Sequence, residues 1–300
     1  MATGRFAPSP TGALHLGNLR TALVAWLAAR SSGGRFLVRM EDLDPAVARR
    51  EHEAGQLSDL AALGLDWDGV VERQSTRADV YGAAISRLAE QGLVYPCFCS
   101  RREIRAAVSA PNGSSPEGAY PGTCRMLTPA EVASMTVSGR RPALRLRTTG
   151  EPVTVTDILH GPYTAAVDDF VLRRQDGMSA YNLAVVVDDA AQGVEQVVRA
   201  DDLLPSTPRQ VYLARLLGLP AMSYLHIPLV LGPTGQRLAK RDGSVTLADR
   251  MAIGETSEEV RGALGLSLGL CLAGERPSVA DLLAVFDARA LPRSPWVFPG

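Results

Sequence analysis

A chain of 300 residues is long enough for two domains, or for one large α/β domain with an appendage. Its net charge of −1 argues against nucleic-acid binding driven by global charge and leaves room for a local basic face. The apolar fraction of 46% and the charged fraction of 21% are typical of a soluble globular protein. No apolar run approaches the ~18 residues of a membrane span and no signal peptide is visible, so we expect a cytoplasmic protein with reduced cysteines.

The segment GRFAPSPTGALHLGN (residues 4–18) predicts a buried strand, a tight turn and the start of a helix. His15 and Asn18 then project from the first helical turn, where free N–H groups and the helix dipole favour phosphate. Gly17 lets a flat base approach the backbone. The alternative is an ordinary strand–turn–helix with a chance histidine, and the missing Gly-Lys-Ser/Thr excludes a Walker loop.

A second predicted strand, residues 35–40, ends in the acidic segment Glu41-Asp42-Leu43-Asp44. The first strand, helix and second strand form a right-handed parallel βαβ unit. Acidic groups at the end of such a strand face the ligand crevice, where Glu41 is suited to receive a substrate ammonium. Asp42 and Asp44 have an alternative role, in which at least one of them caps the next helix.

Apolar spacing predicts further helices over residues 46–64 and 76–92. Strands that alternate with helices favour a doubly wound parallel sheet of the α/β class. We expect residues 140–171 to depart from this rhythm, because alternating β-like segments suggest an inserted sub-domain outside the parallel sheet.

Three of the four cysteines, Cys97, Cys99 and Cys124, fall within 28 positions. In a cytoplasmic chain this clustering favours Zn²⁺ over a disulfide, and three thiolates leave one tetrahedral position open. The candidates for the fourth ligand are Tyr120, His160 and Glu117. The alternative, on spacing alone equally good, is three free cysteines packed as small hydrophobic side chains.

Downstream, the apolar run at residues 181–190 predicts a buried helix, and residues 194–198 predict a strand. Arg199 follows that strand directly and is well placed to bind a carboxylate through two hydrogen bonds. Its alternative is a surface ion pair with Asp201 or Asp202, which would contribute little to stability.

The chain contains 31 basic residues besides histidine but only one lysine, Lys240, in the Gly-flanked loop GQRLAKRDG at 235–243. A lysine that survives such a bias toward arginine suggests a position where a compact ammonium does what a guanidinium cannot. The alternative is a solvated charged loop. The sequence predicts a helix over residues 207–217 and a strand over 227–231 before this loop, and a helix over 278–288 after it.

Together, these motifs resemble the class I aminoacyl-tRNA synthetases. His15-Leu16-Gly17-Asn18 is similar to their HIGH signature, and residues 237–241 (RLAKR) resemble the KMSKS signature. The leading Arg-Phe-Ala-Pro-Ser and the Met-Glu-Asp-Leu-Asp-Pro segment resemble the glutamyl branch. The resemblance covers most of residues 4–250 and implies a Rossmann-type catalytic domain. Arg237 and Ala239 depart from the lysine and serine that are usual in the KMSKS signature.

The resemblance also implies roles for individual residues. Glutamate would be held by one set of residues, and ATP, used with Mg²⁺, would be contacted by another. The glutamate set comprises Arg5, Phe6, Ala7, Pro8, Ser9, Glu41, Tyr181 and Arg199, with Glu41 on the α-ammonium. The ATP set comprises His15, Gly17, Asn18 and Lys240, of which His15, Asn18 and Lys240 are the catalytic candidates. The resemblance further implies one structural Zn²⁺ on Cys97, Cys99, Tyr120 and Cys124.

We expect the length to select a branch within the family, because the 50 residues from Met251 onward cannot house the helical anticodon-binding region of a discriminating glutamyl-tRNA synthetase. The short members activate L-glutamate without tRNA and attach it to queuosine in the anticodon loop of tRNA(Asp), and the resemblance favours a monomer. Two alternatives stay open: a truncated synthetase that charges a tRNA 3′ end, and a non-catalytic ATP- or RNA-binding module.

The expected organisation has four parts. Residues 1–95 and 171–250 form the two halves of the catalytic domain, residues 96–170 an inserted sub-domain with the zinc site, and residues 251–300 a short helical region. Arginine clusters are candidate contacts to the RNA backbone, although a solvated surface is the better explanation for each pair taken singly. They comprise Arg101, Arg102, Arg105, Arg140, Arg141, Arg173 and Arg174.

Overall fold

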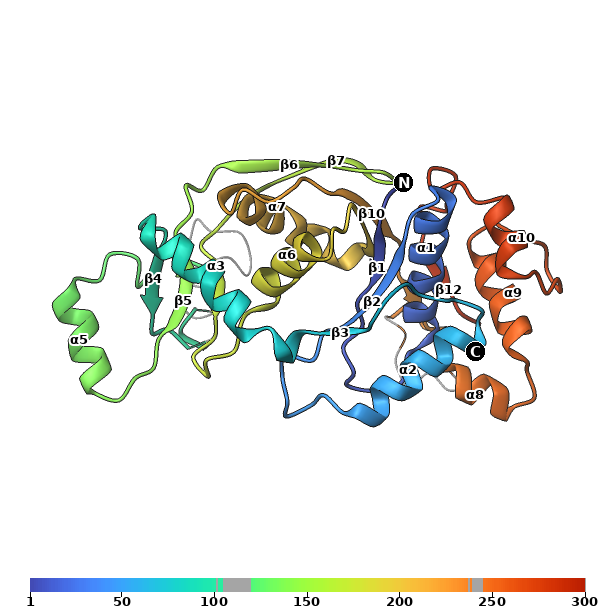
Figure 1. Cartoon of the computed structure of the whole chain (residues 1–300), viewed down its shortest axis with the longest axis horizontal. Helices are drawn as coiled ribbons and strands as arrows, with labels where there is room; N and C mark the ends of the chain where they lie inside the picture. The colour runs from blue at the N-terminus through green and yellow to red at the C-terminus, as the bar shows by residue number, and fades with distance from the viewer. Residues whose placement is uncertain (101, 105–119, 237, 239–244, 300) are drawn as a thin grey trace.

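The computed structural model describes the chain except for residues 101, 105–119, 237, 239–244 and 300, and its central sheet has seven strands in that described part (Figure 1). In spatial order these are β3 (Glu72–Arg73), β2 (Phe36–Met40), β1 (Gly4–Phe6), β9 (Gln196–Ala200), β10 (Ser223–Ile227), β6 (Pro152–Asp157) and β7 (Gly161–Ala166). All neighbours are parallel except β6 and β7. Because β2 and β9 flank β1 on opposite sides, the strand order reverses at β1 and β9, which is where ligands bind in open α/β sheets.

Helices cover both faces of this sheet (Figure 1). On one face lie α1 (Leu16–Ser31), α2 (Arg50–Ala62), α9 (Ser257–Ser267) and α10 (Val279–Ala284), and on the other lie α3 (Ala78–Glu90), α6 (Tyr181–Ala191) and α7 (Thr207–Leu216). Neighbouring strand residues alternate between the two cores: Val38 and Val198 pack with α1, whereas Leu37 and Val197 pack with α6. The predicted doubly wound α/β sheet is therefore confirmed.

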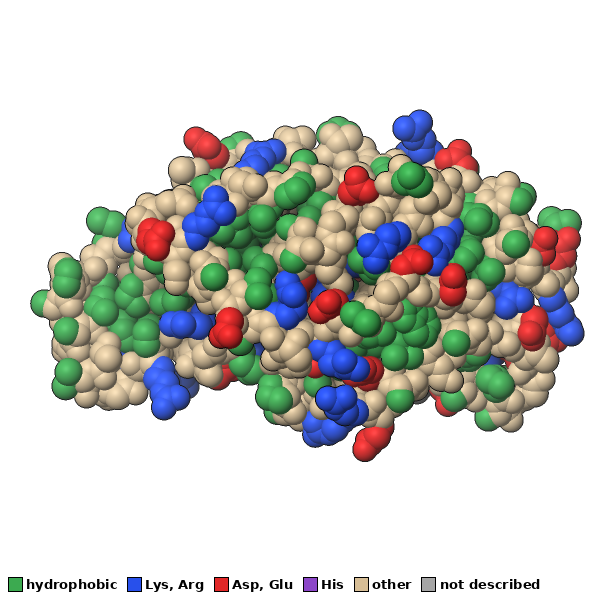
Figure 2. Space-filling view, viewed as in Figure 1, with side chains coloured by type: hydrophobic (Ala, Val, Ile, Leu, Met, Phe, Trp, Pro, Cys, Tyr) green, Lys and Arg blue, Asp and Glu red, His purple; other side chains and the backbone are tan. Residues whose placement is uncertain are grey.

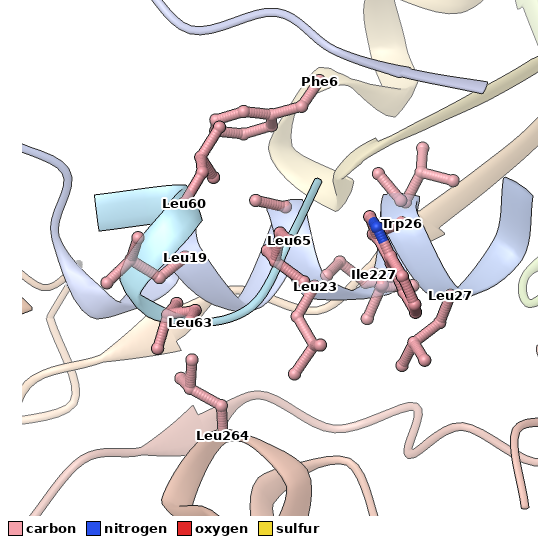
Figure 3. Packing of buried hydrophobic residues seen from close by; sticks show 14 of the residues in the cluster. Phe6, Leu19, Leu23, Trp26, Leu27, Leu60, Leu63, Leu65, Ile227 and Leu264 are labelled. Carbon is pink, nitrogen blue, oxygen red and sulfur yellow. The ribbon is translucent and has the colours of Figure 1, made fainter. Parts of the chain in front are cut away.

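The core on the α1 face is built from leucines at helical spacing (Figure 3). Leu19, Leu23 and Leu27 of α1 are all at most 1% exposed, and Leu264 points from α9 toward Leu63. Burial of each such leucine stabilises the fold by at most about 1.5–3 kcal/mol. Together these contacts hold α1 firmly against the sheet. The rigid helix in turn fixes the position of its own N-terminus.

A smaller antiparallel sheet of β4 (Val94–Cys97), β5 (Ala143–Leu146) and β8 (Val171–Arg173) lies toward one end of the molecule, next to α5 (Pro129–Val137) (Figure 1). The expectation that residues 140–171 lie outside the main sheet is wrong for β6 and β7. β6 pairs with β10 through Tyr224 and Asp157, so this hairpin extends the edge of the main sheet. The boundaries of the inserted sub-domain stay a prediction.

Several local expectations need correction. Neither Asp42 nor Asp44 caps the next helix, since α2 follows Arg49; Asp42 instead accepts hydrogen bonds from Ser75. The strand expected over 227–231 is divided at Pro228, which cannot donate to a ladder, into β10 and β11 (Val230–Leu231).

The remaining elements are short. They comprise the 3₁₀ turns η1 (Gln74–Thr76) and η2 (Asp201–Ser206), the helix α8 (Leu247–Ala252) and the strand β12 (Trp296–Val297), which pairs with β11. No helix of the described part is long and apolar enough to cross a membrane.

On the face drawn in Figure 2, basic and acidic side chains are interspersed. Arg174 pairs with Asp44 and Asp176, and Arg140 lies 3.7 Å from Glu103. Both arginines are about half exposed, which is typical of side chains on a solvated surface. The expectation that these clusters contact RNA stays a prediction, and Arg101 and Arg105 lie outside the described residues.

Candidate active site

A cavity of about 630 Å³ opens where β1 and β9 end and α1 begins. It brings together nearly every residue expected in the glutamate and ATP sets. Those that line it are Arg5, Phe6, Ala7, Pro8, Ser9, His15, Asn18, Glu41, Tyr181 and Arg199. Two are not among the lining residues: Gly17, which is described, and Lys240, which lies outside the described residues. Segments far apart in sequence thus meet at the switch point of the sheet.

His15 is the N-cap of α1 and forms a reciprocal capping box with Asn18. The Asn18 N–H donates to His15 Nδ1 at 3.2 Å, and the His15 N–H donates to Asn18 Oδ1 at 3.2 Å. Because Nδ1 accepts, the neutral ring carries its proton on Nε2 and is a hydrogen-bond donor at that atom. The first turn of α1 contains no acidic residue, so the helix dipole at the cavity is not neutralised locally.

Gly17 also helps to hold the His15 ring, and its expected approach to the base of ATP stays a prediction. A Cβ built there would lie 2.9 Å from Nδ1 and Cε1 of His15. A side chain at position 17 would therefore displace the imidazole, so the absence of a side chain keeps the His15 ring in place.

The described residues on either side of the lysine loop are anchored beside His15. Leu238 and Val245 both lie in the core that contains Leu16, and the Leu16 N–H donates to the Val245 carbonyl at 2.8 Å. Thr246 forms an antiparallel bridge with His15. Val245 and Thr246, which directly follow residues 239–244, therefore lie beside the N-terminus of α1.

Two arginines in the cavity wall differ in how their charge is compensated. Arg5 donates to both carboxylate oxygens of Asp189, at 3.1 and 3.3 Å, and to the Val198 carbonyl. Asp189 also accepts a 2.7 Å hydrogen bond from Arg39, which is fully buried. Burial by itself raises the pKa of Asp189, but Arg5 and Arg39 outweigh it and hold the pKa below its ordinary value.

Arg199, in contrast, is held by neutral acceptors among the described residues. Its Nε–H donates to His226 Nε2 at 3.0 Å, Nη1 to the Tyr181 hydroxyl at 3.3 Å and Nη2 to the Thr207 hydroxyl at 2.7 Å. Arg199 is only 5% exposed, so the alternative of a surface ion pair with Asp201 or Asp202 is wrong. A buried guanidinium without a carboxylate partner is suited to receive an anionic ligand.

Glu41 lines the same cavity, and its carboxylate lies 3.6 Å from Arg39 Nη2. Burial raises its pKa above the ordinary value, although Arg39 and Arg5 oppose the shift. Arg39 was missed by sequence reasoning, as were Asp189, His226, Asp157 and Thr207. The available signal was a charged or titratable residue inside an apolar strand or helix, as in FLVRM of β2 and SYLHI of β10.

A second constellation lies in the small sheet. The sulfur atoms of Cys97, Cys99 and Cys124 are all within 4.8 Å of one another, and the Tyr120 hydroxyl lies 3.3 Å from Cys97 and 3.7 Å from Cys99. Ligands held at about 2.3 Å by one tetrahedral ion are about 3.8 Å apart, so the spacing and the donor chemistry fit Zn²⁺. His160 is exposed in the β6–β7 turn and is not part of this cluster, and Glu117 lies outside the described residues.

Comparisons with known proteins agree with this geometry. Residues 1–267 match the family model of the catalytic domain of class I tRNA synthetases (E and Q). The fold is similar to that of a glutamate tRNA ligase from Elizabethkingia meningosepticum, solved in complex with its amino acid. That likeness has a TM-score of 0.85 and 27% identity, and it covers 99% of this chain and 67% of the other. The chain is thus a ligase of the class I tRNA synthetase type.

Curated relatives define the branch more narrowly. A glutamyl-Q tRNA(Asp) synthetase from Nocardia farcinica is 60% identical over 294 residues, 98% of this chain and 92% of that protein. Another from Symbiobacterium thermophilum is 48% identical and covers 100% and 96% of the two chains. The protein belongs to the glutamyl-Q tRNA(Asp) synthetase family.

Proposed function

We propose that this chain joins L-glutamate to ATP without RNA, forming glutamyl-adenylate and pyrophosphate, and then transfers the glutamyl group to queuosine in the anticodon loop of tRNA(Asp). In the first step an α-carboxylate oxygen attacks the α-phosphorus, and the bond to the β-phosphate breaks. In the second step a queuosine hydroxyl attacks the acyl carbon, AMP leaves, and the hydroxyl proton is released. Membership of the family supports this sequence of steps.

The observation that carries the proposal is the placement of Arg199 and His15 in one cavity. Arg199 offers an uncompensated guanidinium for the side-chain carboxylate of glutamate, and Glu41 offers a carboxylate for its α-ammonium. His15 and Asn18, at the N-terminus of α1, then face the phosphates. Binding both ends of the amino acid across one cavity would leave its α-carboxylate close to the α-phosphorus, the arrangement adenylation requires.

Lys240 completes the proposed machinery as the cation that follows negative charge as it develops on the α-phosphate. ATP would enter with Mg²⁺, which screens the phosphate charge. Because Lys240 is the only lysine in the chain, its role can be tested without interference from other lysine side chains. An amine-reactive probe should label Lys240 and the N-terminus, and ATP should protect the lysine alone.

We further propose a structural Zn²⁺ on Cys97, Cys99, Tyr120 and Cys124, with no open coordination position. The mutual spacing of the three thiols and the phenol supports this ligand set. Its place between β4 and the segment before α5 would tie the two together and stabilise the small sheet.

Pyrophosphate exchange tests the first step. The wild-type protein should exchange labelled pyrophosphate into ATP when glutamate is present and RNA is absent, and Lys240→Ala should lose about 10² to 10³ of the rate. Lys240→Arg is the matched control, because it keeps the positive charge but replaces the compact ammonium with a guanidinium. Unchanged exchange in Lys240→Ala would contradict the role of the lysine. No exchange with the wild-type protein would contradict the proposed activity and would favour the alternative, a non-catalytic binding module.

A further inference from the structure

His226 connects the glutamate cavity to a buried carboxylate on the edge of the sheet. It lies on β10 and is completely buried, between Arg199 of β9 and Asp157 of β6. The ring Nδ1 lies 2.7 Å from Asp157 Oδ2, and Nε2 lies 3.0 Å from Arg199 Nε. A line of contacts thus runs from a side chain of the outer hairpin to a residue that lines the cavity.

The proton positions follow from the partners. The Asp157 carboxylate accepts, so Nδ1 carries the hydrogen, while the Arg199 guanidinium only donates, so Nε2 accepts. The imidazole is therefore neutral, in its Nδ1–H form. Burial and the neighbouring Arg199 hold the pKa of His226 below its ordinary value, which agrees with this assignment.

Asp157 is itself fixed from several sides. Its Oδ1 accepts from the backbone N–H groups of Leu159 and His160, and its Oδ2 accepts from both the backbone and the ring of His226. These hydrogen bonds outweigh burial and keep the pKa of Asp157 below its ordinary value. A carboxylate held so rigidly leaves the imidazole one tautomer and one orientation.

The fixed His226 ring acts on the proposed substrate through its hydrogen bond with Arg199. Contacts within the described residues use one N–H on each guanidinium nitrogen, which leaves one N–H on Nη1 and one on Nη2. The edge of the planar fork between Nη1 and Nη2 matches the two oxygens of a carboxylate. The anchors on Nε, Nη1 and Nη2 decide where this edge points.

On the basis of the proposed function, we propose that Asp157 and His226 are positioning residues, which aim the free edge of Arg199 at the side-chain carboxylate of glutamate. His226 supplies a hydrogen-bond acceptor without adding a second charge beside Arg199. The guanidinium therefore keeps an uncompensated positive charge for its ligand, and this favours glutamate over the neutral amide glutamine.

Two substitutions at one position separate this role from a purely structural one. The amide nitrogen of His226→Asn can replace Nδ1 as donor to Asp157, but the variant has no acceptor that reaches Arg199. His226→Gln extends its amide oxygen to the place of Nε2 and restores that acceptor. We expect the KM for glutamate to rise about tenfold or more in His226→Asn and to be largely restored in His226→Gln. The KM for ATP should be unchanged in both variants.

His160→Gln is the matched control, because His160 is exposed in the same hairpin and only its backbone N–H contacts Asp157. Its KM values should equal those of the wild type. The loss of selectivity against glutamine should follow the KM for glutamate across the variants. An active His226→Asn enzyme with an unchanged KM for glutamate, or a His226→Gln enzyme weaker than His226→Asn, would overturn the inference.

A spectroscopic measurement checks the tautomer independently of activity. Long-range ¹H–¹⁵N correlation spectra of the wild-type protein at neutral pH should show His226 as a neutral imidazole protonated on Nδ1. An Nε2–H ring or an imidazolium would contradict the positioning role even in an active enzyme. A wild-type protein with this tautomer but no glutamate-dependent exchange would instead overturn the proposed function and the substrate named here.

Discussion

Arg39 Nη1 lies 2.7 Å from Asp189 Oδ1, and both side chains are buried next to the cavity in which we propose that glutamate binds. Through Asp189 this arginine is connected to Arg5, and its Nη2 lies 3.6 Å from Glu41. The buried ion pair between Arg39 and Asp189 therefore contacts two residues that line the cavity, Arg5 and Glu41. Removing one partner of such a pair leaves a buried charge uncompensated, which costs more than the pair itself contributes.

The first prediction follows for Asp189→Asn. Arg5 and Arg39 lose their shared carboxylate, so the free energy of unfolding at pH 7 should fall by about 3–5 kcal/mol, measured by urea denaturation. The pKa of Asp189 is depressed in the folded protein, so its stabilisation is present above the unfolded value of about 4 and is lost as pH falls below it. The variant should show a smaller loss of stability than the wild type over that acidic range; equal losses would contradict the ion pair's contribution.

The second prediction separates the two roles of His15. Asparagine is among the best N-cap residues, so His15→Asn should keep α1 capped and change the free energy of unfolding by less than about 1 kcal/mol. It lacks the ring donor, so pyrophosphate exchange should fall about 10² to 10³. His15→Ala should lose both. Retained exchange in His15→Asn would restrict His15 to helix capping.

The third prediction concerns pH and Glu41. Burial raises the pKa of Glu41, so its carboxylate becomes protonated at a higher pH than that of an ordinary glutamate side chain, whose pKa is near 4.3. Protonation removes the negative charge that receives the substrate ammonium. The KM for glutamate should therefore rise as pH falls, beginning above pH 4.3, while the KM for ATP changes less. Glu41→Gln should show a high KM with this pH dependence removed.

The fourth prediction concerns the metal. Wild-type protein should contain about one Zn²⁺ per chain by atomic absorption, and Cys124→Ser should contain much less. Cys271, which lies outside the cluster and donates to the Gly262 carbonyl, provides the control Cys271→Ser. Loss of metal should increase proteolysis within residues 94–146. Equal metal content in Cys124→Ser and Cys271→Ser would contradict the ligand set.

The sequence was most informative where local patterns act alone. The strand–turn–helix at residues 4–31 and the helices at 181–191 and 207–216 follow directly from apolar spacing, and all three are confirmed. The residues expected in the glutamate set also line one cavity. Motifs with chemistry at strand ends could be predicted because parallel strands bring their carboxyl ends to one edge.

Long-range pairing could not be predicted in the same way. The β6–β7 hairpin alternates polar and apolar residues like any edge hairpin, and only its pairing with β10 attaches it to the main sheet. The roles of Asp157 and Asp189 depend on partners 69 and 184 positions away. Such contacts have no local periodicity, so a single sequence does not reveal them.

The central claim is tested most directly by transfer of radiolabelled glutamate to purified tRNA(Asp), with and without queuosine. The account predicts ATP-dependent label in the queuosine-containing tRNA, retained after nuclease removal of the 3′ end and located in the anticodon fragment. The unmodified tRNA should receive none. Label attached to the 3′ ribose of either tRNA, or equal labelling with and without queuosine, would contradict the account.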